Sequence, residues 1–162
     1  MCEVVLRRWS GSDADWYAAS TRDPAIQRFT TEREDLTAAE VRAAIRALLA
    51  SDNPDSGLII TDATTGERLG NIAVSDEGEV SYWLAATARG RGAATAALRC
   101  FSDRILGTTD RPELWLRIHA ENTPSMAVAS RAGYERDPDR DDQSLVKGEL
   151  WKRLANRLVR PA

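Results

Sequence analysis

The chain has 162 residues, 43% of them hydrophobic, which is enough to bury one core and excludes a disordered chain. Its formal net charge of −3 argues against a generic nucleic-acid or anionic-membrane surface, and it permits a cationic partner such as an amine. Two cysteines and one histidine predict no disulfide framework or metal cluster, and no apolar run is long enough for a leader or a membrane span. We therefore expect a single domain over residues 1–162 in the reducing cytoplasm.

The first third of the chain predicts one strand followed by helices. Residues 2–9 are typical of a strand, Ser12 caps a short helix that continues to about Ser20, and Asp23-Pro24 begins a further turn or helix. A capping box at residues 37–40 then opens a longer helix, because apolar residues follow it at helical spacing.

The middle of the chain predicts an antiparallel meander. Strands over residues 58–61 and 70–74 are joined through the Thr65-Gly66 turn. A second turn over residues 76–78 leads into a third strand, which begins at Glu79.

The remaining elements alternate between helices and strands. A helix that follows a glycine-rich loop ends at Gly107, and alternating apolar residues predict a strand over residues 114–118. Thr123 and Pro124 form an N-cap and first-residue pair for the next helix, which Gly133 ends.

The C-terminal part predicts an acidic loop over residues 137–142 and a last strand over residues 148–154. The whole order of elements indicates a mixed α/β (α+β) layer around one sheet.

Residues 79–97, EVSYWLAATARGRGAATAA, predict a binding site for an anion. The segment reads as a buried strand, a loop with Gly90 and Gly92, and a helix of small residues. Such a loop brings backbone N–H groups close to an anion, and the helix behind it adds the positive end of its dipole. Arg89 and Arg91 add fixed positive charge, so one short segment holds three kinds of anion-binding group.

The loop does not match the common nucleotide-binding motifs. A Walker loop ends in Gly-Lys-Ser/Thr, whereas Ala93 and Ala94 follow Gly92 here. The dinucleotide motif needs a third glycine, and that position is Thr95. A nucleotide-binding regulator is therefore disfavoured. The pattern R-x-x-G-x-A over residues 89–94 resembles the acyl-CoA pyrophosphate loop of the GNAT N-acetyltransferases.

A second segment, residues 116–134, carries the same resemblance. Asn122, Ser125, Gly133 and Tyr134 fall where the GNAT family has an Asn, a helix and a Gly-aromatic pair. The N-x-x-S spacing and the strand around Tyr82 look most like the Rim-type branch, which acetylates ribosomal-protein N-termini. The resemblance implies the GNAT fold, a mixed, mostly antiparallel central sheet with splayed central strands and flanking helices.

The resemblance also implies that acetyl-CoA is the acyl donor, with no metal, and that transfer is direct, in a ternary complex with an amine. The pyrophosphate would take N–H groups from residues 91–95, and Asn122 would reach the pantetheine amide. The implied coenzyme A site consists of Tyr82, Trp83, Leu84, Arg89, Gly90, Arg91, Gly92, Ala93, Ala94, Thr95, Asn122 and Ser125.

Glu79 and Ser125 are the candidate catalytic residues. Glu79 stands four residues before Trp83, where family members often place a general base, but a solvated carboxylate at a strand end is an equally good interpretation. Ser125 could protonate the leaving thiolate, or it could be an ordinary polar residue in a helix first turn. The Tyr that many members carry seven residues after the Asn is Ala129 here, so the usual general acid is absent.

The acceptor is expected to be a primary amine, first a peptide or protein N-terminus, and second a small amine or an aminoglycoside-type polyamine. An acyl-CoA-binding module with weak catalysis is the rival that Ala129 supports. We expect no nucleic-acid or membrane partner, and either a monomer or a homodimer. His119 is interpreted as structural or exposed. Trp115 and Arg117 could line the acceptor cleft, but packing is the favoured interpretation of both.

Overall fold

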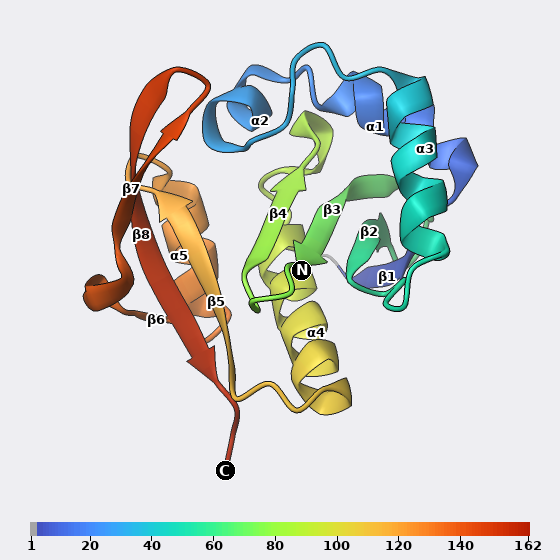
Figure 1. The fold of residues 1–162 in the computed structure, drawn as a ribbon. Coiled ribbons are helices and arrows are strands. Elements are labelled where there is room, and N and C mark those ends of the chain that lie inside the picture. The colour runs from blue at the N-terminus through green and yellow to red at the C-terminus, as the bar shows by residue number, and fades with distance from the viewer. Residues whose placement is uncertain (1–2) are drawn as a thin grey trace.

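The first of two sheets is the predicted antiparallel meander extended by the N-terminal strand (Figure 1). The computed structural model describes residues 3–162, and Cys2, where the first strand was expected to begin, lies outside them. Each strand pairs with its neighbour in the order β1-β2-β3-β4, all antiparallel. Their bounds are β1 Val4–Arg8, β2 Gly57–Asp62, β3 Arg68–Val74 and β4 Val80–Leu84.

The second sheet is larger than the sequence predicted. Its long strand, β8, pairs on one side with β5 and on the other with β6 and β7. The expected acidic loop is therefore wrong at its end, where Asp142 opens a strand. Lys147 (φ 52°) and Gly148 (φ 81°) both lie in the left-handed region and turn β7 tightly into β8. The bounds are β5 Glu113–His119, β6 Glu135–Arg136, β7 Asp142–Val146 and β8 Glu149–Val159.

One parallel bridge joins the two sheets within the described part of the chain. Glu79 is bridged to Trp115, and the Trp115 N–H donates to the Gly78 carbonyl (3.1 Å). From this point β4 and β5 diverge toward α2 (Pro24–Phe29), as Figure 1 shows. The expectation of one continuous sheet is corrected to two sheets, and the expectation of splayed central strands is confirmed.

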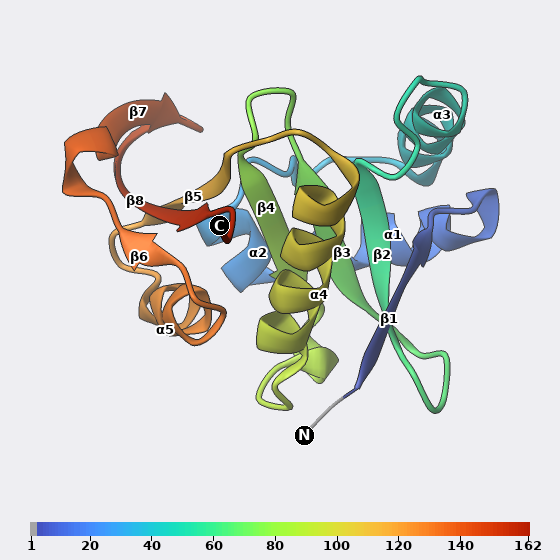
Figure 2. The same cartoon turned by 90° about the horizontal axis from the view of Figure 1, so that it is seen from below.

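Helices cover both faces of the first sheet (Figure 2). β2 explains why, because Leu58 and Ile60 pack in the core cluster with α4, whereas Ile59 packs in the cluster with α1 and α3. Successive side chains of a strand point to opposite faces, so an unbroken apolar run marks a strand that is covered twice. The helices are α1 Ala14–Ser20, α3 Ala38–Leu49 and α4 Ala93–Thr108, with α5 Thr123–Arg131 beside the second sheet.

The N-caps of the first helices agree only in part with those predicted from the sequence. The box of Thr37 and Glu40 is confirmed, with each side chain accepting from the other residue's backbone N–H. The cap at Ser12 is wrong, because Ser10 caps a 3₁₀ turn, Gly11–Asp13, that precedes α1. Two further 3₁₀ turns are Ala86–Ala88 and Pro138–Arg140.

Two other predicted helix ends differ from the structure. Asn122, not Thr123, is the N-cap of α5, since its Oδ1 accepts from the Ser125 N–H (3.3 Å). Gly107 lies inside α4, whose end is closed by hydroxyl groups of Thr108 and Thr109 that donate to carbonyls one turn back. Gly133 follows α5 with φ 90°, as predicted.

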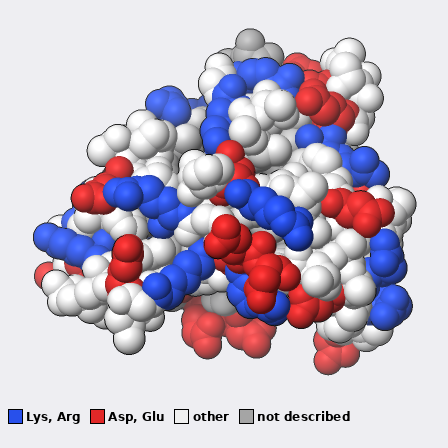
Figure 3. Space-filling model, turned by 90° about the horizontal axis from the view of Figure 1, so that it is seen from above, with Lys and Arg blue, Asp and Glu red and all other residues white. Residues whose placement is uncertain are grey.

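The described surface has mixed charge. On the face drawn in Figure 3, basic and acidic side chains are interspersed and do not gather by sign. Within residues 3–162 no helix is long and apolar enough to cross a bilayer. The same residues hold no group of three or more His, Cys, Asp or Glu side chains that could bind a metal.

Asp13 is a buried carboxylate that ties the N-terminal turn to two strands. Its oxygens accept from Arg7 Nη1 and Nη2 (both 2.9 Å), from Arg68 Nε (2.8 Å) and from the Ser10 N–H (2.8 Å). Burial alone would raise the pKa of Asp13, but the bonds from Arg7 and Arg68 outweigh it and lower the pKa to about 2. Ionised Asp13 therefore stabilises the folded state.

Asp13→Asn should lower the free energy of unfolding by about 2 kcal/mol at pH 7, because charge-assisted hydrogen bonds are lost. The folded pKa lies below the ordinary value of 3.8, so this stability is present above pH 4 and is lost as pH falls toward 2. Urea denaturation at pH 7 and pH 2.5 measures the difference. The control is Asp15→Asn two residues later in α1, where the side chain is exposed. An equal loss at both pH values would contradict the prediction.

Candidate active site

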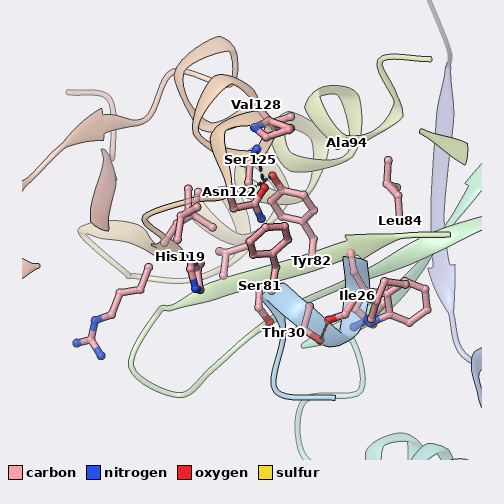
Figure 4. A pocket seen from close by; sticks show the side chains of 18 of the residues that line it. Ile26, Thr30, Ser81, Tyr82, Leu84, Ala94, His119, Asn122, Ser125 and Val128 are labelled. Carbon is pink, nitrogen blue, oxygen red and sulfur yellow. Dashed lines mark hydrogen bonds between the residues drawn. The ribbon is translucent and has the colours of Figure 1, made fainter. Parts of the chain in front are cut away.

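A cleft of about 1180 Å³ opens where β4 and β5 diverge (Figure 4). β4 forms one wall, the starts of α4 and α5 form another, and α2 and β5 close the far side. Nearly all of the predicted site residues line it, namely Glu79, Tyr82, Trp83, Leu84, Arg89, Gly90, Gly92, Ala93, Ala94, Thr95, Asn122 and Ser125. Arg91 turns elsewhere, and its Nη2 donates to Glu67 Oε2 (3.2 Å).

The glycine loop ends directly on the first turn of α4. Gly90 (φ 77°) and Gly92 (φ 78°) both adopt the left-handed conformation, and Gly92 is the N-cap. The first intrahelical bond runs from the Ala96 N–H to the Gly92 carbonyl (3.2 Å). The N–H groups of residues 93–95 therefore have no partner within the helix. Ala93 and Ala94 add little bulk beside them. These amides lie at the end of the cleft where the sequence predicts an anion site.

Arg89 is hydrogen bonded to α2 and to the end of β4. Its Nη2 donates to Asp23 Oδ2 (2.6 Å) and to the Leu84 carbonyl (3.1 Å). Asp23 is the N-cap of α2, and the bond from Arg89 is the main cause that lowers its pKa. Arg89 therefore joins the loop, the end of β4 and α2, and it would have to leave Asp23 to reach a phosphate directly.

The start of α5 brings two hydroxyl groups together. Asn122 caps the helix through the Ser125 N–H, and Ser125 Oγ lies 2.7 Å from Tyr82 Oη on β4. Burial raises the pKa of Tyr82, while the bond to Ser125 and the charge of Arg131 oppose that rise. Ala129 is fully buried one turn further along the helix. The cleft therefore has a phenol, but from β4 rather than from α5.

Glu79 is half-buried at the end of the cleft where the two sheets meet. Burial raises the pKa of its carboxyl group, and the charges of Arg117 and Arg153 oppose the rise. Both arginines also bind Asp142, through Arg117 Nη1 (3.0 Å) and a two-point contact from Arg153 (both 2.8 Å). A carboxyl group with a raised pKa accepts protons closer to neutral pH, which suits a general base.

Glu32 is a site residue that the sequence did not reveal. Its Oε1 accepts from the Trp83 indole N–H (3.3 Å) and from the Tyr17 hydroxyl. The Trp83 ring in turn stacks on Trp16 with a centroid distance of 5.8 Å. Glu32 lies 51 positions from Trp83 in a polar stretch without periodicity, so no local pattern indicated that the two would meet.

Aromatic and cationic groups complete the far side of the cleft. His119, interpreted as structural or exposed, lies between Phe29 (5.2 Å between ring centroids) and Trp151 (5.0 Å), and all three line the cleft. Its Nδ1 accepts from a backbone N–H, which leaves Nε2 as the protonated nitrogen of the neutral ring. Arg117 packs over the Trp115 ring, as the favoured interpretation expected (4.3 Å from the guanidinium carbon to the ring centroid), and it also lines the cleft, which was the alternative left open.

α2 spans the open side of the cleft from one sheet to the other. Asp23 binds Arg89 next to β4, as described above. Gln27 accepts from Lys147 Nζ at the β7–β8 turn through its carbonyl (2.8 Å) and its side-chain oxygen (3.0 Å). Arg28 donates to Glu121 beyond the end of β5. The helix thus connects the two sheets on the side opposite the Glu79–Trp115 bridge.

Residues 3–135 match the family model described as an acetyltransferase (GNAT) domain. The chain belongs to the GNAT acetyltransferase family. The match covers more than half of the chain, and it confirms the predicted family, fold and enzyme class. No curated protein matches the chain by sequence at a significant level.

Solved structures of GNAT enzymes share the fold at low sequence identity. A GNAT-family acetyltransferase from Bacillus anthracis is 15% identical, with a TM-score of 0.81 over 99% of this chain and 97% of that chain. A ribosomal-protein-S5-alanine acetyltransferase from Vibrio fischeri is 13% identical (TM-score 0.83, 99% and 94%). A spermidine N-acetyltransferase from Vibrio cholerae, in complex with CoA and spermine, is 12% identical (TM-score 0.80, 98% and 96%). These similarities show the fold, and the Rim-type branch stays a prediction.

Proposed function

We propose that this GNAT enzyme transfers the acetyl group of acetyl-CoA to a primary amine by direct attack within a ternary complex. The observation that carries the proposal is that the loop amides, Ser125 and Glu79 open on one cleft between the splayed strands. An anion site, a hydroxyl donor and a carboxylate are the groups that this transfer needs. Similar structures were solved with CoA, among them the spermidine enzyme and a ribosomal L7/L12 N-acetyltransferase, which supports the choice of donor.

The donor would lie with its pyrophosphate on the amides of residues 93–95 and its pantetheine arm along β4. Both arginines of the loop already have carboxylate partners, Asp23 and Glu67. Backbone amides and the positive end of the α4 dipole therefore supply most of the attraction. The two left-handed glycines shape the loop that leads into these amides, and there is open space beside both.

The backbone N–H of Leu84 is the best-placed oxyanion donor. The Ala85 N–H donates to Leu69 of β3 (2.8 Å), and N–H groups alternate in direction along a strand. The Leu84 N–H therefore points away from β3, toward the edge that β5 has left. A donor at that edge can bind the oxygen of the tetrahedral intermediate, which a paired strand could not do.

The charges on the acceptor side favour a substrate with one ammonium group. Glu32 and Glu79 are negative, whereas Arg117 and Arg153, which share Asp142, are positive. A polyamine would place additional positive charge near the two arginines. A peptide or protein N-terminus carries one ammonium followed by neutral amides, so we place it first. A small amine or polyamine is the second candidate, because the spermidine enzyme has the same fold.

Release of free thiol from acetyl-CoA tests this function. We expect turnover with short peptides that have a free N-terminus, and none with the same peptides after N-terminal blocking. The same assay with spermidine, an aminoglycoside and lysine tests whether the acceptor is instead a small amine or a polyamine. Thiol release with polyamines alone would overturn the peptide assignment, and no release with any amine would overturn acetyl transfer to amines.

Gly92→Val should abolish the thermal stabilisation by CoA, because a β-branched residue does not adopt φ 78° without strain and the loop amides would move. Arg91→Ala should only weaken the stabilisation. Thermal unfolding with and without CoA measures both effects. The control is Gly107→Val, which places the same side chain in open space at the far end of α4. Equal stabilisation of Gly92→Val and the parent would contradict the role of the loop.

Glu79→Gln should lower kcat/KM about 10²-fold at pH 7, the lower end of the usual contribution of a general base. Glu79 accepts a proton only above its raised pKa, so the parent loses activity as pH falls through that value. The variant depends on free amine, and its rate should rise up to pH ~8, the pKa of an α-amine. The loss should therefore shrink at pH 9. Glu77→Gln on the adjacent turn is the control, and a Glu79→Gln rate within threefold of the parent at pH 7 would exclude the base.

A further inference from the structure

Two tyrosines of this chain are hydrogen bonded to serines at the same oxygen–oxygen distance. Tyr134 Oη lies 2.7 Å from Ser102 Oγ, and both residues are buried in the core. Tyr82 Oη lies 2.7 Å from Ser125 Oγ, and both residues line the cleft, where Figure 4 shows them pointing toward each other from β4 and α5. The first pair is part of the packing, whereas the second faces the space proposed for the thioester.

The cleft pair supplies a phenol that α5 does not. Ala129 occupies the α5 position where a tyrosine would be expected, and it is fully buried. Ser125 alone would be a poor acid, because an aliphatic hydroxyl group gives up its proton less readily than a phenol. Tyr82 approaches Ser125 from the opposite wall, across the splay between the sheets. The chemistry that position 129 lacks is thus available through a hydrogen bond.

We propose that Tyr82 is a positioning residue for Ser125, which turns the serine hydroxyl toward the departing sulfur of CoA and restores its proton. This inference rests on the proposed acetyl transfer. The phenol donates to Ser125 Oγ, and Oγ keeps its own hydrogen for the sulfur, since a hydroxyl oxygen donates once and accepts twice. Asn122 fixes the backbone of Ser125 through the helix cap, which holds the serine side chain toward Tyr82 on β4.

The proton balance of the step closes without a further reactant. As the amine nitrogen forms its bond to the acetyl carbon, the carbon–sulfur bond breaks and its electron pair stays on sulfur. Sulfur takes the proton of Ser125, and Ser125 takes the proton of Tyr82. The proton that the nitrogen loses passes to Glu79 or water, and exchange with solvent water returns one to Tyr82. A neutral amine and a thioester thus give an amide and a thiol.

The surroundings keep the phenol in the form that this step needs. Burial raises the pKa of Tyr82, so the group carries its proton at neutral pH. Arg131 opposes that rise from the end of α5, and its charge favours the electron-rich oxygen that forms as the proton moves. The positive end of the α5 dipole acts in the same sense on the sulfur.

Tyr82→Phe tests the inference, because it removes the hydroxyl and keeps the ring. We expect kcat to fall about tenfold to hundredfold, as part of the ~10²–10⁴ that an acid contributes, with little change in KM for acetyl-CoA. Ser125→Ala should lower kcat by at least as much, and the double variant no further, because the two residues act as one unit. The matched control is Tyr134→Phe, which breaks the other 2.7 Å pair and should change stability but not kcat.

The solvent deuterium isotope effect on single-turnover transfer separates proton transfer from packing, because a purely structural role of Tyr82 would not change it. The parent should show the effect of two protons in motion, and Tyr82→Phe a smaller one. Equal kcat and equal isotope effects in Tyr82→Phe and the parent would overturn the inference while leaving the proposed function intact. Additive losses in the double variant would also overturn it. A parent that releases no thiol with any amine would instead overturn the proposed function.

Discussion

The parallel bridge between Glu79 and Trp115 is the constraint on which the rest of this molecule depends. Among residues 3–162 it is the one strand pairing that joins the two sheets, and it holds β4 and β5 together only at their start. Every backbone group of β4 beyond that point that faces β5 is left without a strand partner. The same divergence creates the space for a substrate and the free N–H of Leu84 at its edge. A continuous sheet would remove both.

Ion pairing decides which positive groups of the cleft are free to act. Arg89, Arg117 and Arg153 each contact an aspartate, and the first of these contacts also holds α2 over the cleft. Surface ion pairs contribute little stability, but they fix where a side chain lies. The amides at the start of α4 carry no such partner. In the proposed binding mode, attraction of the donor therefore depends mainly on backbone geometry, whereas Arg89, Arg117 and Arg153 maintain the shape of the site.

Local patterns in the sequence predicted the parts of this structure that local interactions determine. The meander, the Thr37 capping box and the left-handed glycine after α5 follow from residues within one turn or hairpin. The glycine loop, together with the resemblance to a family, predicted most of the cleft. β7 was missed because its turn uses Lys147-Gly148 instead of an Asn-Gly pair, and because its first three residues are polar. Glu32 was missed because its contacts with Trp83 and Tyr17 form only after α1 packs on the sheet.

The Tyr82–Ser125 pair shows why motif matching finds a site more easily than its chemistry. A search for a phenol on α5 stops at Ala129, and the sequence then offers only an isolated serine. In the folded chain the phenol comes from β4. Tyr82 and Ser125 are 43 positions apart in the sequence, and they meet where β4 and β5 diverge from the Glu79–Trp115 bridge. Ala129 lies one turn after Ser125 and is fully buried in the core cluster, so the helix face that carries Ser125 is the face that packs inward. The phenol that α5 does not carry at position 129 thus comes from β4, on the other side of the cleft.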